Sequence, residues 1–333
     1  MFRQHLQYLI CPECRGDFNL SAQQANGDVV ESGSLICQKC TRAYPIVKGI
    51  PHFVPSENYA SGFGYEWTKH ARTQYDSYTG VPISEKRFFE ETKWPRDLKG
   101  QTILEVGGGS GRFTEQALKT GAMVVSLDYS HAVEANFASN GTNPNVLIVQ
   151  GDLYKMPFRE QSYDNLYCFG VLQHTPDPEK SFLTLPMFLK PGGRLAADVY
   201  KRASYLRGIL SRLVPSKYWV RPFTRGKPAE TLYPKTKAYI EAMWPLATFL
   251  GKIPKFGRWL NWRLVIADYR GMYDLPEEVF KEWAILDTFD MLSPAYDYPQ
   301  TIETFKAWFE KAGLRDIEVH YGYNGIEGRA TKP

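Results

Sequence analysis

Four glycines occupy five consecutive positions directly after an apolar run, in the stretch ILEVGGGSGRF at residues 103–113. A buried strand followed by such a turn is typical of the first strand of a parallel sheet, where a loop without side chains lets the backbone approach a ligand. The dinucleotide pattern Gly-x-Gly-x-x-Gly does not fit, because its third glycine would fall on Arg112 or Thr114. The stretch therefore predicts a ligand-binding loop of another kind.

Strand and helix patterns alternate regularly around this loop. Apolar runs predict five strands, at residues 102–107, 122–128, 145–151, 163–170 and 194–200. Helical patterns lie between them, including Arg112–Lys119 and Pro178–Leu189, and a further helix at 301–313 precedes a strand at about 315–321. This order predicts an α/β fold, a parallel sheet with helices on both faces.

Four of the five cysteines form two knuckles near the N-terminus, CPEC with Cys11 and Cys14 and CQKC with Cys37 and Cys40. Two Cys-x-x-Cys knuckles can deliver four thiolates to one tetrahedral zinc ion, and four thiolates leave no coordination position for a substrate. We therefore expect a structural zinc ribbon at residues 1–55. A redox dithiol is the alternative, and Cys168 is expected to be a core residue.

Charge is distributed unevenly along the 333 residues, whose net charge is +4. Residues 201–270 hold 15 Lys or Arg and 3 Asp or Glu, a net +12, which leaves −8 for the remainder. The N-terminus lacks the apolar core of a signal peptide, and no apolar run is long enough to span a membrane, so a cytoplasmic location is expected.

Segment boundaries follow from these patterns. Residues 56–100 carry nine aromatic residues without a regular period, and are interpreted either as a docking segment or as a flap over a ligand. Residues 201–300 are more than a bare sheet requires and hold five of the eight tryptophans, so we interpret them as an inserted, mainly helical cap. Residues 101–200 are expected to form the core, and residues 301–333 to complete its sheet.

The loop pattern Glu-x-Gly-x-Gly-x-Gly, together with Asp128, GDLYKMPF and LKPGGRL in register, resembles class I S-adenosylmethionine-dependent methyltransferases. The stretches YPIVKGIPHFV, FGYEW and VLQHTPDP resemble a narrower group of bacterial methyltransferases with an N-terminal zinc ribbon. The resemblance implies a Rossmann-like fold with S-adenosylmethionine as cofactor. The cofactor residues that it implies are Glu105, Gly107, Gly109, Gly111, Asp128, Tyr129, Asp152 and Leu153, with Tyr65, Trp67 and Arg87 from the flap.

Each implied role has a structural alternative. Asp128 is expected to accept hydrogen bonds from the ribose hydroxyls and Asp152 from the adenine amino group, whereas both could instead cap a helix or brace a turn. Glu105 is expected to meet the amino-acid end of the cofactor or to brace the loop. His174 is the expected general base if the acceptor is a hydroxyl, with a backbone-bonded loop histidine as the alternative. Tyr296, Asp297 and His320 are weaker acceptor-side residues.

Three functions are compatible with these residues. The first is methylation of a small molecule, most simply O-methylation of a sugar or another natural-product precursor. The second is methylation of an RNA base, against which stand the absence of an NPPF-type tetrapeptide and the five basic and four acidic residues of the ribbon. The third is a cofactor-binding scaffold without catalysis. The sequence does not name the acceptor or the oligomeric state.

The basic stretch at 201–227 has eight basic residues and no acidic one. We expect it to grip a phosphate or carboxylate of the acceptor, with Arg221 and Arg225 as the contacting residues. A solvated basic face is one alternative. Weak attachment to a membrane surface through a short amphipathic helix at 205–214, or to RNA, is another.

Overall fold

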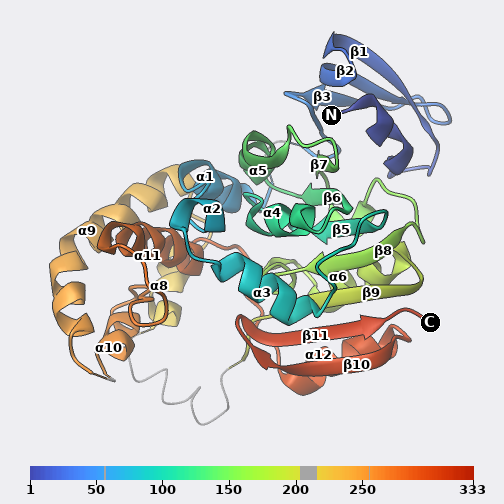
Figure 1. Cartoon of the computed structure of the whole chain (residues 1–333). Coiled ribbons are helices and arrows are strands. Elements are labelled where there is room, and N and C mark those ends of the chain that lie inside the picture. The colour runs from blue at the N-terminus through green and yellow to red at the C-terminus, as the bar shows by residue number, and fades with distance from the viewer. Residues whose placement is uncertain (56–57, 203–215, 255) are drawn as a thin grey trace.

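The computed structural model describes residues 1–55, 58–202, 216–254 and 256–333. Figure 1 shows a small ribbon unit in dark blue beside one edge of a central sheet, and a helical cap beyond the loops at another side. The helix considered for residues 205–214 lies outside the described residues.

The ribbon is a four-stranded antiparallel sheet in the order β1-β2-β3-β4. A 3₁₀ helix η1 (Arg3–Tyr8) precedes its strands, which are β1 (Phe18–Asn26), β2 (Val29–Cys37), β3 (Ala43–Val47) and β4 (Ile50–Pro51). The hairpin of β1 and β2 turns at Gly27, whose φ of 57° lies in the left-handed region that glycine adopts easily. This hairpin spans the long interval between the two cysteine knuckles.

The core is a seven-stranded sheet in the order β10-β11-β9-β8-β5-β6-β7. Its five parallel strands are β5 (Thr102–Val106), β6 (Met123–Asp128), β7 (Val146–Gln150), β8 (Tyr163–Cys168) and β9 (Leu189–Val199). The antiparallel strands β10 (Arg315–Gly322) and β11 (Gly325–Thr331) follow helix α12 (Ile302–Lys311) and extend the sheet beyond β9. The predicted Rossmann-like α/β class is confirmed.

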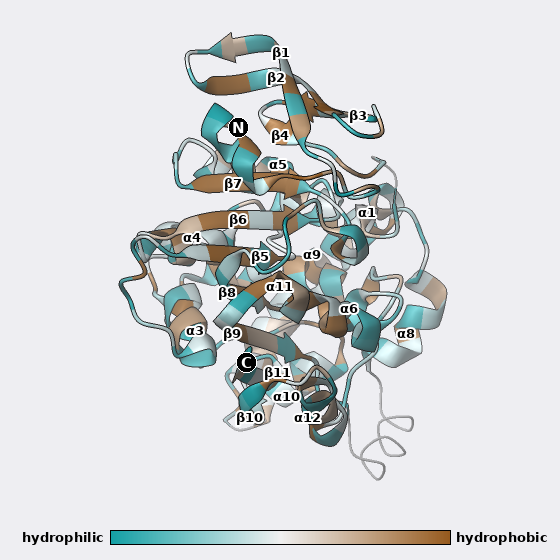
Figure 2. Cartoon of the chain, turned by 90° about the vertical axis from the view of Figure 1, so that its right-hand side faces the viewer, coloured by the Kyte–Doolittle hydropathy of each residue, from teal (hydrophilic) through white to brown (hydrophobic). Residues whose placement is uncertain are grey.

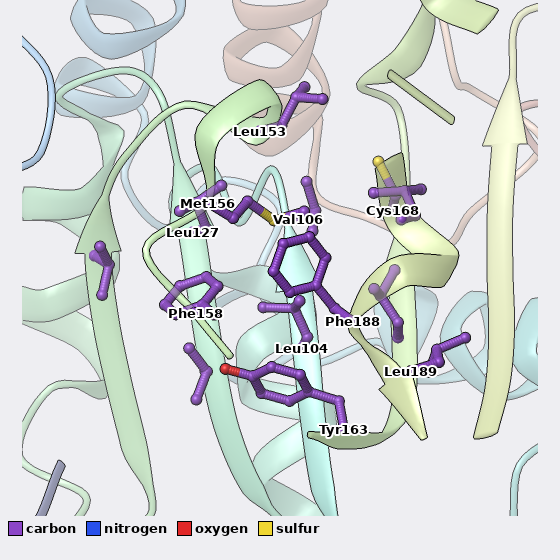
Figure 3. Packing of buried hydrophobic residues seen from close by; sticks show 14 of the residues in the cluster. Leu104, Val106, Leu127, Leu153, Met156, Phe158, Tyr163, Cys168, Phe188 and Leu189 are labelled. Carbon is purple, nitrogen blue, oxygen red and sulfur yellow. The ribbon is translucent and has the colours of Figure 1, made fainter. Parts of the chain in front are cut away.

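Helices cover both faces of this sheet. One face carries α4 (Arg112–Lys119) and α5 (Ala132–Asn140), and the other carries η2 (Leu153–Lys155), η3 (Leu172–His174), α6 (Pro178–Thr184), η4 (Leu185–Phe188) and α12. The central strands are rich in apolar residues (Figure 2). Figure 3 shows one part of the core, in which Leu104 and Leu127 meet Phe158 and Phe188. Cys168 is fully buried in this cluster, as expected from its strand.

Helices also occupy residues 58–100, for which the sequence indicated no regular element. They are α1 (Ser61–Lys69), α2 (Asp76–Thr79) and α3 (Ile83–Thr92). Helix α3 packs on α4, β9 and β11, whereas α1 contacts α5 and two cap helices. Helices α1 and α3 each pack on more than one element, so they do not display a single apolar stripe, and the four-residue helix α2 has no buried residue.

The cap consists of four described helices, α8 (Lys217–Thr224), α9 (Ala229–Gly251), α10 (Gly257–Arg263) and α11 (Glu277–Leu292). Helix α11 packs on α9, α8 and α1, which joins the cap to the segment before the core.

Helix α6 of the core is shorter than the helix predicted at Pro178–Leu189. It ends at Thr184, and the chain continues as the 3₁₀ turn η4 to Phe188, because Pro186 cannot donate a backbone hydrogen bond within a longer α-helix.

The ribbon and the core share one hydrophobic cluster, which contains Leu9, Phe18 and Leu35 from the ribbon and Met156 and Phe158 from the core. Backbone hydrogen bonds reinforce the contact, since Ile10 N donates to the Pro157 carbonyl at 2.9 Å and Phe53 N donates to the Gln150 carbonyl at 2.8 Å. The ribbon thereby covers the free edge of β7.

Candidate active site

A cavity of about 630 Å³ lies where α1, the carboxyl ends of the parallel strands and the cap meet. This is within the range of about 300–1,000 Å³ that is usual for small-molecule sites. Eleven of the predicted site residues line it: Gly107, Gly109, Asp128, Tyr129, Asp152, Leu153, Trp67, Arg87, His174, Arg221 and Asp297. Six others are not part of the lining: Glu105, Gly111, Tyr65, Arg225, Tyr296 and His320.

Glycines 107 and 109 form the loop on the cavity wall. Gly107 has φ +83°, and a Cβ atom on it would lie 2.1 Å from Cγ2 of Val171. Gly109 has φ +52°, and its Cβ would face the indole of Trp67 at 3.5 Å. Backbone conformation and neighbouring side chains therefore already require glycine at position 107, apart from any ligand.

Glu105 and Gly111 lie beneath the loop rather than in the cavity. Glu105 is 1% exposed and accepts a hydrogen bond from Thr114, and burial raises the pKa of its carboxyl group. Gly111 has φ +96°, and a Cβ on it would meet Oδ1 of Asn136 at 2.2 Å. The structure thus places Glu105 in the bracing position considered as the alternative to a cofactor contact.

Asp128 ends β6 and holds the loop from the other side. Its Oδ2 accepts a hydrogen bond from Gly109 N at 2.8 Å, and its Oδ1 accepts two from Ser130, at 2.8 and 2.7 Å. Burial raises the pKa of Asp128, and these hydrogen bonds oppose the shift because they favour the carboxylate. Oδ2 keeps a further lone pair with which it can accept from a ligand hydroxyl, whereas Ser130 occupies both lone pairs of Oδ1.

The neighbouring strand ends supply an aromatic and a second carboxylate. The ring of Tyr129 stacks on that of Tyr59, with centroids 4.9 Å apart. Asp152 caps η2 by accepting from Tyr154 N at 2.9 Å and also lines the cavity, so the capping alternative and a position at the cavity wall coexist. Leu153 beside it forms part of the same wall.

The flap residues have different positions. Trp67 lines the cavity, whereas Tyr65 packs against Tyr233 of the cap with ring centroids 5.6 Å apart. Arg87 lines the cavity but is held by two buried carboxylates, with Nε 2.5 Å from Glu91 and Nη2 2.5 Å from Asp198. Tyr65 and Trp67 lie on different faces of α1, because residues two positions apart on a helix do not share a face.

Arg112 was not among the predicted contacts. It follows the glycine loop, lines the cavity and forms neither a hydrogen bond nor an ion pair with any described residue. Desolvation lowers the pKa of its guanidinium to about 10. Its Cζ lies 4.5 Å from the ring centre of Phe113. A cation in this position can bind the carboxylate of an amino acid or another anion, and its place directly after the loop was the available sequence signal.

His174 is buried next to the rings of Phe63 and Tyr200, at centroid distances of 5.3 and 5.2 Å. Its Nδ1 lies 2.9 Å from the carbonyl oxygen of Tyr296. A carbonyl can only accept, so Nδ1 carries the proton of the neutral ring and Nε2 keeps a free lone pair. Nε2 has no hydrogen-bond partner among the described residues. The backbone of Tyr296, rather than its ring, is the part that serves this site.

The residues predicted to grip an anion are otherwise engaged or distant. Arg221 donates from Nη1 and Nη2 to the carbonyls of Met291 and Pro294, at 3.1 and 3.0 Å, and its Nε lies 3.8 Å from Asp297. Lys217 is 3.0 Å from the same carboxylate. Arg225 and His320 lie outside the cavity lining. Arg221 is engaged in this way because α8 packs on α11, which directs the Arg221 side chain towards backbone carbonyls at the end of α11.

Three carboxyl groups of the cavity were not predicted. Glu66 comes from α1, and Asp287 and Asp290 lie three residues apart on α11. None has an ion pair within 4 Å among the described residues. Burial raises the pKa of Glu66 and of Asp290, and that of Asp287 to about 7, with mutual repulsion adding to the effect. Two aspartates at helical spacing within an apolar helix were the sequence signal.

The four knuckle cysteines meet at one point of the ribbon. Their sulfur atoms lie within 4.8 Å of one another, with Cys14 Sγ 3.4 Å from Cys37 Sγ and Cys11 Sγ 3.7 Å from Cys40 Sγ. Tetrahedral zinc with Zn–S bonds of about 2.3 Å places its thiolates about 3.8 Å apart. The residues therefore fit a tetrahedral metal ion, and among the described residues this is the one group with such a ligand set.

Comparisons with known proteins agree with this geometry. Residues 104–197 match the methyltransferase domain family, and residues 3–49 match the family of Trm112p-like proteins. The ubiquinone biosynthesis O-methyltransferase of Coxiella burnetii is 32% identical over 132 residues, which are 39% of this chain and 55% of that protein. The protein of the same name from Xanthomonas oryzae is 28% identical over 145 residues, 40% of this chain and 60% of that protein.

The chain thus spans little more than half the length of these curated relatives. A methyltransferase from Aquifex aeolicus is similar over 81% of this chain and 98% of its own, with a TM-score of 0.43 and 13% identity. The glycine loop, the strand-end carboxylates and the cysteine cluster all fall within or beside the matched residues. Residues 104–197 therefore form a domain of the methyltransferase family, preceded by a Trm112p-like ribbon with four clustered cysteines.

Proposed function

We propose that the protein transfers a methyl group from S-adenosylmethionine to a hydroxyl group of a small molecule, with His174 as the general base. The observation that carries this proposal is the state of the imidazole. Its Nδ1 is fixed by the Tyr296 carbonyl, and its Nε2 is buried without a partner at the wall of the cavity. A nitrogen in that state can accept the proton of a hydroxyl.

The cofactor would be held by the loop of Gly107 and Gly109, by Asp128 at its ribose and by Asp152 at its adenine. Arg112 is suited to its carboxylate, since this guanidinium has no ion pair among the described residues. All of these groups border one cavity. We include zinc at the four cysteines in the proposal, as a structural ion that stabilises the ribbon.

S-adenosylmethionine supplies a methyl carbon that its sulfonium has already activated. The residues around the cavity have to align the acceptor oxygen with that carbon and exclude water. When the acceptor oxygen takes the methyl group that the cofactor would supply, the hydroxyl proton would pass to His174 Nε2. The Tyr296 carbonyl would stabilise the imidazolium through Nδ1–H.

For the acceptor we propose an uncharged, hydroxyl-rich molecule such as a sugar. Glu66, Asp287 and Asp290 can accept hydrogen bonds from hydroxyl donors, and the rings of Tyr269, Tyr273 and Trp283 offer flat apolar surface. This replaces the expected anionic acceptor, because Arg221 already has protein partners and Arg225 lies outside the cavity lining.

The Asp128→Ala variant is expected to bind S-adenosylmethionine more weakly by about 1.5–3 kcal/mol, the range for a hydrogen bond to a charged group. Isothermal titration calorimetry measures this directly. Asp164→Ala is a matched control, because Asp164 also accepts a strand-end amide, from Thr102, but lies outside the cavity lining. Equal losses in the two variants would remove the ribose role from Asp128.

The His174→Gln variant is expected to lower kcat by about 10²–10⁴-fold, the usual contribution of a general base, while cofactor affinity stays unchanged. Methyl transfer is followed with labelled cofactor on a panel of sugars and phenols. His320, which lies outside the cavity lining, provides the control, as His320→Gln should retain full activity. A fully active His174→Gln enzyme would rule out the base.

A further inference from the structure

Five large apolar side chains are exposed at the outer end of the cap, where α9 ends and α10 begins. Phe249 and Phe256 are 66% and 65% exposed, and the other three are between 38% and 49% exposed. We call this group the apolar tip: Leu246, Phe249, Ile253, Phe256 and Trp259. A soluble protein seldom gathers so many large apolar residues in a short exposed segment without a binding partner.

The charges within the segment that carries the apolar tip have one sign, and the acidic Glu277 lies beside it, where it accepts a hydrogen bond from Thr248. Residues 246–263 contain four Lys or Arg and no Asp or Glu. Lys252 and Arg258 are exposed among the described residues, and the Arg263 guanidinium lies 5.1 Å from the ring centre of Trp259. Phenylalanine and tryptophan flanked by lysine and arginine is the composition of segments that lie in the interface of an anionic bilayer.

We propose that the apolar tip docks on an anionic lipid surface. The aromatic and aliphatic side chains would enter the boundary between headgroups and acyl chains, while Lys252 and Arg258 stay with the phosphates. No helix among the described residues has the length and apolar character to cross a bilayer, so the contact would be peripheral. It involves a different segment from the stretch at 205–214 that the sequence suggested.

Two other occupants fit less well. A second copy of the chain would bring its own basic residues against Lys252 and Arg258, and like charges disfavour that contact. RNA would stack on Phe and Trp, but Leu246 and Ile253 offer no π-surface for a base. An aliphatic contribution next to aromatic and basic residues favours hydrocarbon over nucleobases.

The apolar tip is close to the cavity along the chain. Trp259 is exposed, whereas Trp262 of the same helix lines the cavity, and Met272 both lines it and is 52% exposed. Docking at the tip would therefore bring the part of the cavity lining around Trp262 and Met272 towards the lipid surface. The proposal itself depends only on the exposed surface of the cap, so it can hold or fail independently of the proposed reaction.

The test is flotation of the full-length protein with two kinds of vesicle. One kind contains phosphatidylcholine alone, and in the other about a third of the lipid is phosphatidylglycerol. We expect binding to the anionic vesicles only, weakened by salt. The Phe249→Ser/Phe256→Ser variant should bind at least 100-fold more weakly, because two aromatic side chains no longer leave water. Lys252→Gln/Arg258→Gln should bind about 25-fold more weakly, about fivefold for each charge.

Matched controls are Met187→Ser and Val47→Ser, which replace side chains that are each 47% exposed outside the cap. Both should bind vesicles like the unaltered protein, and circular dichroism checks that all variants are folded. Absence of binding to anionic vesicles would overturn the proposal. An equal loss of vesicle binding in the control variants would overturn it too. So would sedimentation that shows the tip variants converting a dimer to a monomer. Release of the protein from vesicles by RNA, under conditions in which salt does not release it, would also overturn it.

Discussion

Removal of the metal with a strong chelator is expected to unfold the ribbon. Structural zinc contributes about 10–16 kcal/mol of apparent binding free energy in comparable small units, far more than the packing of a four-stranded sheet of this size can replace. We expect one zinc per chain by metal analysis. Hydrogen exchange should show loss of protection at β1 to β3, while the central strands β5 and β8 remain protected.

The effect should extend to one edge of the core, because the ribbon shares a hydrophobic cluster with the core and donates a backbone hydrogen bond to Gln150 of β7. Cys14→Ser should reproduce the result without chelator. Cys168 is an internal control, since its fully buried thiol should stay unreactive while the four knuckle thiols become accessible to a thiol reagent. A metal-free protein with an intact, protected ribbon would contradict the prediction.

The Gly107→Ala variant is expected to lose about 2–5 kcal/mol of stability and most of its affinity for S-adenosylmethionine. The left-handed conformation costs about 1–2 kcal/mol for a residue with a Cβ, and overpacking against Val171 costs about 1–3 kcal/mol more. Urea denaturation measures the first quantity and calorimetric titration the second. The affinity falls because either the loop or Val171 must move, and both border the cavity.

Two variants separate the causes. Gly192 also has a positive φ, +77°, but nothing lies within 4 Å of the position of its Cβ, so Gly192→Ala measures the backbone term alone. Adding Val171→Ala to Gly107→Ala should recover the stability lost through overpacking, while the cost of the left-handed backbone at position 107 remains. If Gly107→Ala and Gly192→Ala are equally destabilised, the contact with Val171 is not a source of strain.

Local patterns were sufficient for the regular parts of the fold. The helix at Arg112–Lys119 has the predicted bounds, and the five parallel strands form where apolar runs alternate with helical ones. The cysteine knuckles come together because each is a short turn and the β1–β2 hairpin connects them. Helix α6 shows the limit of such reasoning, as Pro186 shortened it within an otherwise helical pattern.

The candidate site could be predicted only in part. The loop glycines and the strand-end carboxylates Asp128 and Asp152 border the cavity because strand ends of a parallel sheet meet at one edge. Those positions follow from the order of strands in the sequence. Arg221 and Glu66 could not be placed in this way, because they belong to helices whose rotation depends on what they pack against.

By itself, the sequence determined the parts that short-range rules govern: the α/β order, the glycine loop at 107–111 and the four thiolates. Tertiary structure decided which side chains the cavity receives, since α1 and α11 are far apart in sequence and bring Glu66, Asp287 and Asp290 to one wall. It also fixed the tautomer of His174, through a carbonyl 122 residues away. Contacts over such distances depend on the packing of whole elements, which no local pattern of residues specifies.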